Sequence, residues 1–155
     1  DVVTREFLNP ALFPHLQANM PKTMVAIAPV ECTDQGGTVT RKTRYKPQPL
    51  IKSIGPKKIT ADMMAWVEES TFDKAARVLK FKNVPDSGRL RSLLVNEGTI
   101  TFRDVGGKTE RTVSGELKVK VFLLGSIAEK IIYKNAQEIL NEEAAAFKSW
   151  LADKK

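Results

Sequence analysis

The sequence predicts an α+β protein in which a curved antiparallel sheet of about six strands is covered by one long C-terminal helix. Segments of alternating apolar and polar residues follow one another from residue 24 to residue 124, and turn sequences such as DQGG and VGGK separate them. After Gly125 the apolar residues instead recur at three- and four-residue steps, which is the period of an amphipathic helix. Strands that follow one another without intervening helices exclude a doubly wound parallel sheet.

The first elements are read from prolines and turn residues. Residues 1–8 are expected to form a short helix that ends at Asn9, because the residue before a proline avoids the helical conformation. Residues 11–22 are expected to be irregular or briefly helical. The segments 24–32 and 37–46 are expected to pair as a hairpin, with Pro29 placing the first at a sheet edge or a bulge. Residues 47–58 hold three prolines and one glycine, so a loop is expected there.

Four further strands are expected at residues 59–72, 77–83, 91–104 and 108–124. The last of them places Leu117 and Val119 on one face and Lys118 on the other. A strand with one apolar and one polar face belongs to an antiparallel sheet that is packed on one side only. Gly115 is expected at a bulge or a bend in this strand.

The C-terminal helix is expected to begin with a capping box formed by Ser126 and Glu129. Its apolar stripe runs to Leu151 with a single interruption at Glu143. No other long amphipathic segment is present in the sequence. This helix is therefore expected to turn at Gly125 and fold back across the concave face of the sheet.

Length and charge narrow the class of protein. A chain of 155 residues suggests a single domain over residues 1–155. The net charge of +7 favours anionic partners such as a phospholipid head group, a membrane surface or nucleic acid. The alternative is a solvated surface, because Lys and Arg are spread along the chain without a block of five like charges. Nucleic acid ranks last, since aromatic residues make up only 7% and no recognised motif interleaves them with basic ones.

No run of apolar residues approaches the roughly 18 needed to span a bilayer. No secretory signal pattern opens the chain either. We therefore expect an intracellular protein that is soluble or peripheral to a membrane, or an organellar one if a targeting segment preceded Asp1.

The residue inventory argues against catalysis and metal binding. Cys32 is the only cysteine and His15 the only histidine, which excludes a Cys/His zinc cluster. Glu68 and Glu69 are adjacent on an expected strand, so they point to opposite faces and cannot act as a carboxylate pair. We expect no enzymatic activity, no catalytic residues, no metal and no cofactor.

Two segments carry a resemblance to a known superfamily. The segment SGELKVKVFLLGSIAEKIIYKNAQEILNEEAAAFKSWL resembles an uncharacterised bacterial branch of the START-like superfamily, also called SRPBCC or Bet v 1-like, which has the helix-grip fold. The segment WVEESTFD more weakly resembles the PRELI domains that carry phospholipid between membranes, with Glu68, Glu69 and Ser70 matching their EES strand. Members of the superfamily start with a strand before the first helix. This chain opens inside that helix, so we expect that strand to have been trimmed or lost.

The resemblance implies an apolar ligand between the sheet and the long helix. The candidate lining residues are Met64, Trp66, Phe72, Phe102, Val119, Val121, Leu123, Ile131, Ile132, Ile139 and Leu140. The alternative is that these side chains pack against one another and close the core. Arg41 and Arg111 are candidates for binding a lipid phosphate, since a guanidinium fits phosphate oxygens bidentately. Their alternative roles are a salt bridge with Glu68 or Glu69, or extension to solvent.

Two functions follow from this interpretation. The first is the binding or transport of a lipid or other hydrophobic molecule without chemistry. The second is an accessory subunit of a larger assembly, including a membrane or organellar complex, that uses the same fold without a ligand.

Overall fold

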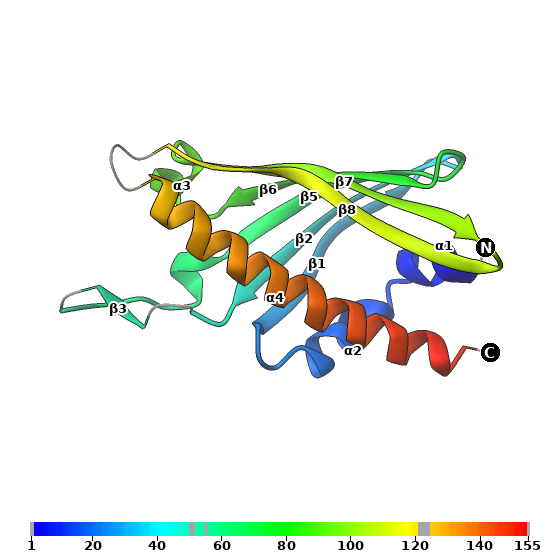
Figure 1. Cartoon of the computed structure of the whole chain (residues 1–155), viewed down its shortest axis with the longest axis horizontal. Coiled ribbons are helices and arrows are strands. Elements are labelled where there is room, and N and C mark those ends of the chain that lie inside the picture. Colours follow the sequence, from blue (N-terminus) through cyan, green and yellow to red (C-terminus); the bar gives the residue numbers. More distant parts are fainter. Residues whose placement is uncertain (1, 50–51, 55, 121–124, 155) are drawn as a thin grey trace.

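Six antiparallel strands form one curved sheet, and a long helix crosses its concave face (Figure 1). The structure is a computed structural model that describes residues 2–49, 52–54, 56–120 and 125–154. The strand order is β1-β2-β5-β6-β7-β8. The strands are β1 (Met24–Asp34), β2 (Thr38–Pro47), β5 (Trp66–Asp73), β6 (Val78–Pro85), β7 (Leu94–Val105) and β8 (Lys108–Val119). The predicted α+β class and the six-stranded antiparallel sheet are confirmed.

Helices lie at both ends of the chain and in the connection between β6 and β7. They are α1 (Val2–Leu8), α2 (Leu12–Asn19), the short α3 (Gly88–Arg91) and α4 (Gly125–Ala152). A small separate hairpin, β3 (Ser53–Ile54) with β4 (Lys57–Lys58), and the 3₁₀ turn η1 (Asp62–Met64) connect β2 to β5. In the described part of the chain, no helix is long and apolar enough to cross a lipid bilayer.

Strand β1 is an edge strand with two register shifts against β2, one of which lies between Pro29 and Glu31. A proline cannot donate to the strand ladder, so it is tolerated at such a place. The edge position and the bulge predicted from Pro29 are therefore both confirmed.

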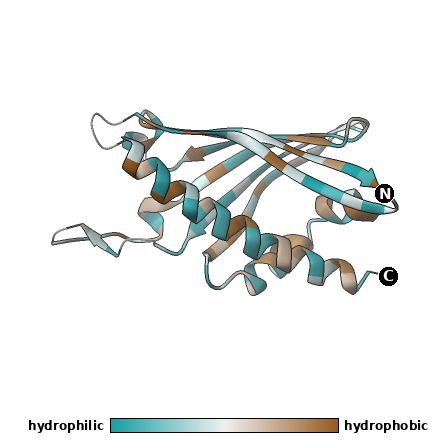
Figure 2. Ribbon diagram, in the orientation of Figure 1, coloured by the Kyte–Doolittle hydropathy of each residue, from teal (hydrophilic) through white to brown (hydrophobic). Residues whose placement is uncertain are grey.

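The core lies where α1, α2 and the C-terminal half of α4 meet the concave face. One row of apolar side chains runs in register across five strands: Val39, Phe72, Leu79, Ile100 and Val113. Phe7 of α1, Phe13 of α2 and Phe147 of α4 pack against this row. Figure 2 shows the alternation of hydrophobic and hydrophilic residues along the strands that produces one apolar face.

Gly115 allows strands β7 and β8 to approach each other closely. The register between β7 and β8 is unbroken, so there is no bulge at this position. Gly98 and Gly115 pair directly, and a Cβ atom on Gly98 would lie 2.2 Å from the Ser114 carbonyl oxygen. A Cβ atom on Gly115 would lie 2.5 Å from the Glu97 carbonyl oxygen. Only glycine fits at either position.

Two predictions about element ends were wrong, and a third, the end of the last strand at residue 124, lies outside the described residues. Ser126 lies inside α4, and Glu129 accepts a hydrogen bond from the Val119 amide at 2.8 Å, so the two residues form no capping box. Strand β5 begins only at Trp66, because residues 62–64 form the 3₁₀ turn η1. Strand β8 ends at Val119, and residues 121–124 lie outside the described residues.

Candidate functional site

The concave face has a closed half and an open half. In the closed half, Ala146 and Phe147 of α4 are buried against the core. Residues 126–140 of α4 contain no buried residue, and Ile127 is 56% exposed. Across from the helix, Trp66, Glu68, Asn83 and Leu117 are only half-buried. We call the region between these four side chains and residues 126–140 the open half.

Polar side chains line the boundary between the two halves. Thr43 of β2, Glu68 of β5 and Asn83 of β6 lie side by side in register on the concave face. In the next row, Arg41 is paired with Ser70. Side chains in a strand alternate between its two faces. These groups therefore face inside, because each lies an even number of positions from a core residue of its own strand, such as Phe72. The interior is therefore apolar at the closed end and polar at the boundary.

Glu68 is an acidic group of this site without an ion-pair partner among the described residues. No Lys or Arg among the described residues lies within salt-bridge distance of its carboxyl group, and the Ser70 hydroxyl hydrogen-bonds to it. Burial, opposed by the charge of Arg41, raises the pKa of Glu68 from its ordinary 4.5 to about 7. Glu68 therefore exchanges its proton near neutral pH.

Arg41 is a buried cation held by neutral groups. Only 7% of its surface is exposed, and its Nη1 donates to the Phe7 carbonyl oxygen at 3.1 Å. Its guanidinium lies 5.1 Å from the centre of the Phe7 ring and 5.6 Å from that of Phe13. Aromatic faces attract a cation but do not neutralise it. The predicted alternatives, a salt bridge with Glu68 or Glu69 or extension to solvent, are wrong.

Arg111 instead pairs with a residue of the helix. Its Nη2 lies 2.8 Å from Oε2 of Glu143, and the two side chains are 16% and 20% exposed. The salt bridge to Glu68 or Glu69 considered for Arg111 is therefore wrong as well. Glu143 is the residue that interrupts the apolar stripe of α4, and the interruption is explained by this ion pair between β8 and α4. The interruption of the apolar stripe marked Glu143 in the sequence as a charged residue on the buried face of the helix. Its partner, Arg111, could be identified only from the fold.

Three buried polar atoms have no hydrogen-bond partner within the described chain: Trp66 Nε1, Asn83 Oδ1 and Arg111 Nε. All three side chains belong to the concave face. An unsatisfied buried polar group costs about 1–3 kcal/mol, so such groups usually have water or a ligand as a partner. Tyr45 stacks on Trp66 with ring centres 5.4 Å apart. Burial, followed by the charge of Glu68, raises the pKa of the Tyr45 hydroxyl well above 10, which keeps it neutral.

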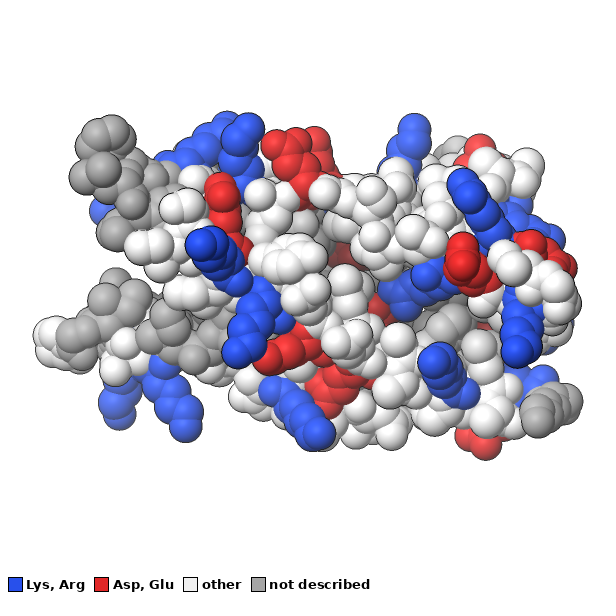
Figure 3. Space-filling model, viewed as in Figure 1, with Lys and Arg blue, Asp and Glu red and all other residues white. Residues whose placement is uncertain are grey.

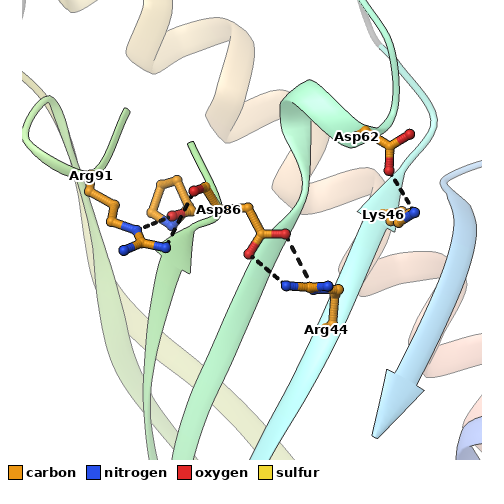
Figure 4. Close-up of polar contacts among 6 residues, drawn as sticks. Arg44, Lys46, Asp62, Asp86 and Arg91 are labelled. Carbon is orange, nitrogen blue, oxygen red and sulfur yellow. Dashed lines mark hydrogen bonds and ion pairs between the residues drawn. The ribbon is translucent and has the colours of Figure 1, made fainter. Parts of the chain in front are cut away.

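Polar contacts hold the chain segments at the Tyr45–Trp66 end of the sheet (Figure 4). Arg44 of β2 pairs with Asp86 at 3.2 Å, and Lys46 pairs with Asp62 of η1 at 2.6 Å. Arg91 of α3 donates to the Pro85 carbonyl oxygen at 2.7 Å. These contacts connect η1 and the segment before α3 to the strands that border the open half.

The structure separates the predicted lining residues into five groups. Phe72 and Phe102 are buried in the closed core. Trp66, Val119, Ile132, Ile139 and Leu140 are half-buried, whereas Ile131 is 40% exposed. Met64 lies in η1 rather than on a strand, so its predicted place on one strand face with Trp66 and Phe72 was wrong. Val121 and Leu123 lie outside the described residues. Sequence reasoning missed Glu68, Asn83 and Tyr45 as interior groups.

Two depressions lie on the outer surface. A mainly apolar groove of about 590 Å³ lies between α2 and β1, lined by residues such as Phe13, Met24 and Ile27. A depression of about 370 Å³ lies on strands β2, β5 and β6 and includes the solvated charges of Lys42, Glu69 and Lys82. The lining of the second depression includes Arg41 but not Glu68, so neither depression combines a buried cation with a carboxyl group of raised pKa. The interior is therefore the better candidate site.

The charged surface has no single concentrated region in the view of Figure 3, where Lys and Arg are dispersed among acidic residues. This distribution fits the solvated surface that was one of the two interpretations of the net charge of +7.

Comparison with known proteins identifies the fold. The model of a family described as "Protein of unknown function (DUF2505)" matches residues 84–151, from the end of β6 into the last turns of α4. That part includes Arg111 and Glu143 but not Arg41 or Glu68. No curated protein matches the chain. The crystal structure of TTHA0849 from Thermus thermophilus is similar over 95% of this chain and 88% of that one, with a TM-score of 0.61 and 16% sequence identity. At this identity the similarity shows the fold alone, which is helix-grip-like.

Proposed function

We propose that the chain is a START-like binding protein that holds a lipid or another small apolar molecule in the open half, without catalysing a reaction on it. The observation that carries the proposal is the loose fit of α4. Between residues 126 and 140 the helix has no buried residue, and the sheet side chains opposite it are only half-buried. Protein interiors are close-packed as a rule, so a half-packed sheet–helix contact is an expected place for a ligand.

The chemistry of the open half suits an amphipathic molecule. Leu117, Val119 and Ile132 offer half-buried apolar surface. Each Å² of apolar surface removed from water contributes roughly 25 cal/mol. Glu68 and Asn83 at the inner boundary offer polar contacts for a head group. A chain-like ligand with one polar end would meet both requirements.

The test is a substitution that fills the open half. Leu117→Trp points a large side chain into it, and Lys118→Trp places the same side chain on the opposite face of β8 as the matched control. If the open half is space, Leu117→Trp changes the free energy of unfolding by less than about 1 kcal/mol and abolishes binding of the neutral fluorescent probe N-phenyl-naphthylamine. If it is packed, overpacking costs roughly 1–3 kcal/mol and the wild type binds no probe. The second result would refute the proposal.

A second function, an accessory subunit of a larger assembly, is favoured by one observation. Strand β8 is twelve residues long and ends the sheet with no strand on its outer side among the described residues. An unpaired edge is a common route to a protein partner. Native mass spectrometry of the purified protein distinguishes the two functions, since a co-purifying subunit supports the second and a retained lipid supports the first.

A further inference from the structure

The charges that act on Glu68 do not balance when Glu68 is protonated. The charged groups of the described residues that act on Glu68 are Arg41 of β2, Arg111 of β8 and Glu143 of α4. Tyr45 of β2, which also faces this space, is neutral, and Ser70 of β5 contributes only a hydrogen bond. Two cations and one carboxylate leave one positive charge if Glu68 is an acid. They leave none if Glu68 is a carboxylate.

Arg41 is the cation whose charge is not compensated. Arg111 has Glu143 at 2.8 Å, whereas Arg41 has only the Phe7 carbonyl oxygen and two aromatic rings. A guanidinium carries five donors, and one of them accounts for the contact with Phe7. A buried charge is normally paired, because its transfer from water is costly. An anion beside Arg41 would supply the missing partner.

Glu68 is the neighbour that would meet this anion. Arg41 faces Ser70 across the β2–β5 pair, and Thr43 faces Glu68, so Glu68 lies diagonally across from Arg41 on the same face. Diagonal neighbours of this kind are within reach of long side chains. A carboxylate at Glu68 would repel the anion, whereas a carboxylic acid would donate a hydrogen bond to it.

We propose that the open half takes the monoanionic head group of an apolar molecule between Arg41 and Glu68, and that Glu68 takes up one proton from solvent as the anion binds. The proton goes to a carboxylate oxygen of Glu68, and the interior then holds two positive and two negative charges. A cationic head group would instead leave a net positive charge in every protonation state of Glu68. This inference rests on the proposed function and specifies its ligand class.

The test compares two ligands of equal chain length, decanoate and decanol, by calorimetry on the full chain. Decanoate affinity should fall about twentyfold from about pH 6.5 to about pH 8.5, because Glu68 with a pKa of about 7 loses its proton over this range. Titrations in buffers of different ionisation enthalpy should give an uptake that approaches one proton per decanoate at the higher pH. Decanol binding should not depend on pH. A third ligand, lauroyl lysophosphatidylglycerol, is titrated in the same way, and its affinity relative to decanoate distinguishes a phosphodiester head group from a carboxylate.

Two variants locate the proton. Glu68→Gln mimics the protonated acid, so it should bind decanoate equally well at both pH values, without proton uptake. Glu69→Gln, on the opposite face of the same strand, should retain the pH dependence of the wild type. If decanol binds but decanoate binds no more tightly at low pH, the inference is wrong and the binding function stands. If none of the three ligands binds, the binding function is wrong and the inference fails with it.

Discussion

The ion pair between Arg111 and Glu143 should hold α4 to the sheet. We expect Glu143→Leu to lower the free energy of unfolding by about 3 kcal/mol, since removing one partner of a buried pair leaves the other charge uncompensated. The low end of the usual range applies because the two side chains are 16% and 20% exposed. Arg111 Nε is already without a hydrogen-bond partner within the described chain, and the Phe7 ring 5.6 Å from the guanidinium does not neutralise its charge.

The measurement is urea unfolding followed by circular dichroism. With a slope of about 1–3 kcal/mol per molar urea, the loss should lower the midpoint by roughly 1–3 M. The experiment is best done near pH 6, where Glu68 holds its proton and cannot ionise to balance the freed Arg111. Glu138→Leu, on the exposed side of the same helix, is the control and should stay within about 0.5 kcal/mol of the wild type.

A double-mutant cycle decides between a true pair and two independent contacts. Arg111→Met together with Glu143→Leu should recover part of the loss, because two apolar side chains replace the buried pair without leaving a charge. If the two single losses simply add, or if Glu143→Leu matches the wild type, the pair does not connect β8 to α4 and the reasoning is refuted.

Two further predictions concern Glu68 and Gly98. Because burial raises the pKa of Glu68 to about 7 in the folded state, the fold holds a proton that the unfolded chain releases near 4.5. The contribution of Glu68 to the free energy of unfolding should therefore be largest at low pH. It should fall by about 1–3 kcal/mol as the pH rises through 7. Glu68→Gln should remove this decline and Glu69→Gln should keep it, and parallel curves for all three proteins would contradict the raised pKa. Gly98→Ala should destabilise by at least about 2 kcal/mol, because its Cβ atom would lie 2.2 Å from the Ser114 carbonyl oxygen. Gly88→Ala, which meets open space, should change the midpoint little, and an equal midpoint for Gly98→Ala would show that β7 and β8 separate easily.

Much of the fold was predictable because it depends on local periods. The switch from a two-residue period to a three- and four-residue period predicted where α4 begins, and the structure starts that helix at Gly125. Pro29 predicted the edge strand and its bulge. The errors came where two local signals competed. The β-forming Ile59 and Thr60 favoured a strand that begins there, yet residues 62–64 close a 3₁₀ turn with the Ala65 amide donating to the Asp62 carbonyl oxygen.

The candidate site was harder to predict because it depends on pairing across the sheet. The sequence singled out Arg41 and Arg111 as candidate head-group residues, but it could not say which carboxylate each would meet. Glu143 is thirty-two residues from Arg111 in sequence and comes from the helix. Glu68 was matched to a lipid-carrier motif by resemblance, but its raised pKa arises mainly from burial, which only the folded structure determines.

The sequence alone determined the class of the fold, the order of its main elements and the apolar face of the last strand, since these follow from side-chain periodicity along the chain. The tertiary structure decided how closely α4 approaches the sheet along its length. It also decided that Arg111 is neutralised while Arg41 is not. These outcomes depend on distances between residues far apart in sequence. The energetic cost of each buried charge depends on its surroundings in the folded structure, and no local sequence pattern predicts this cost.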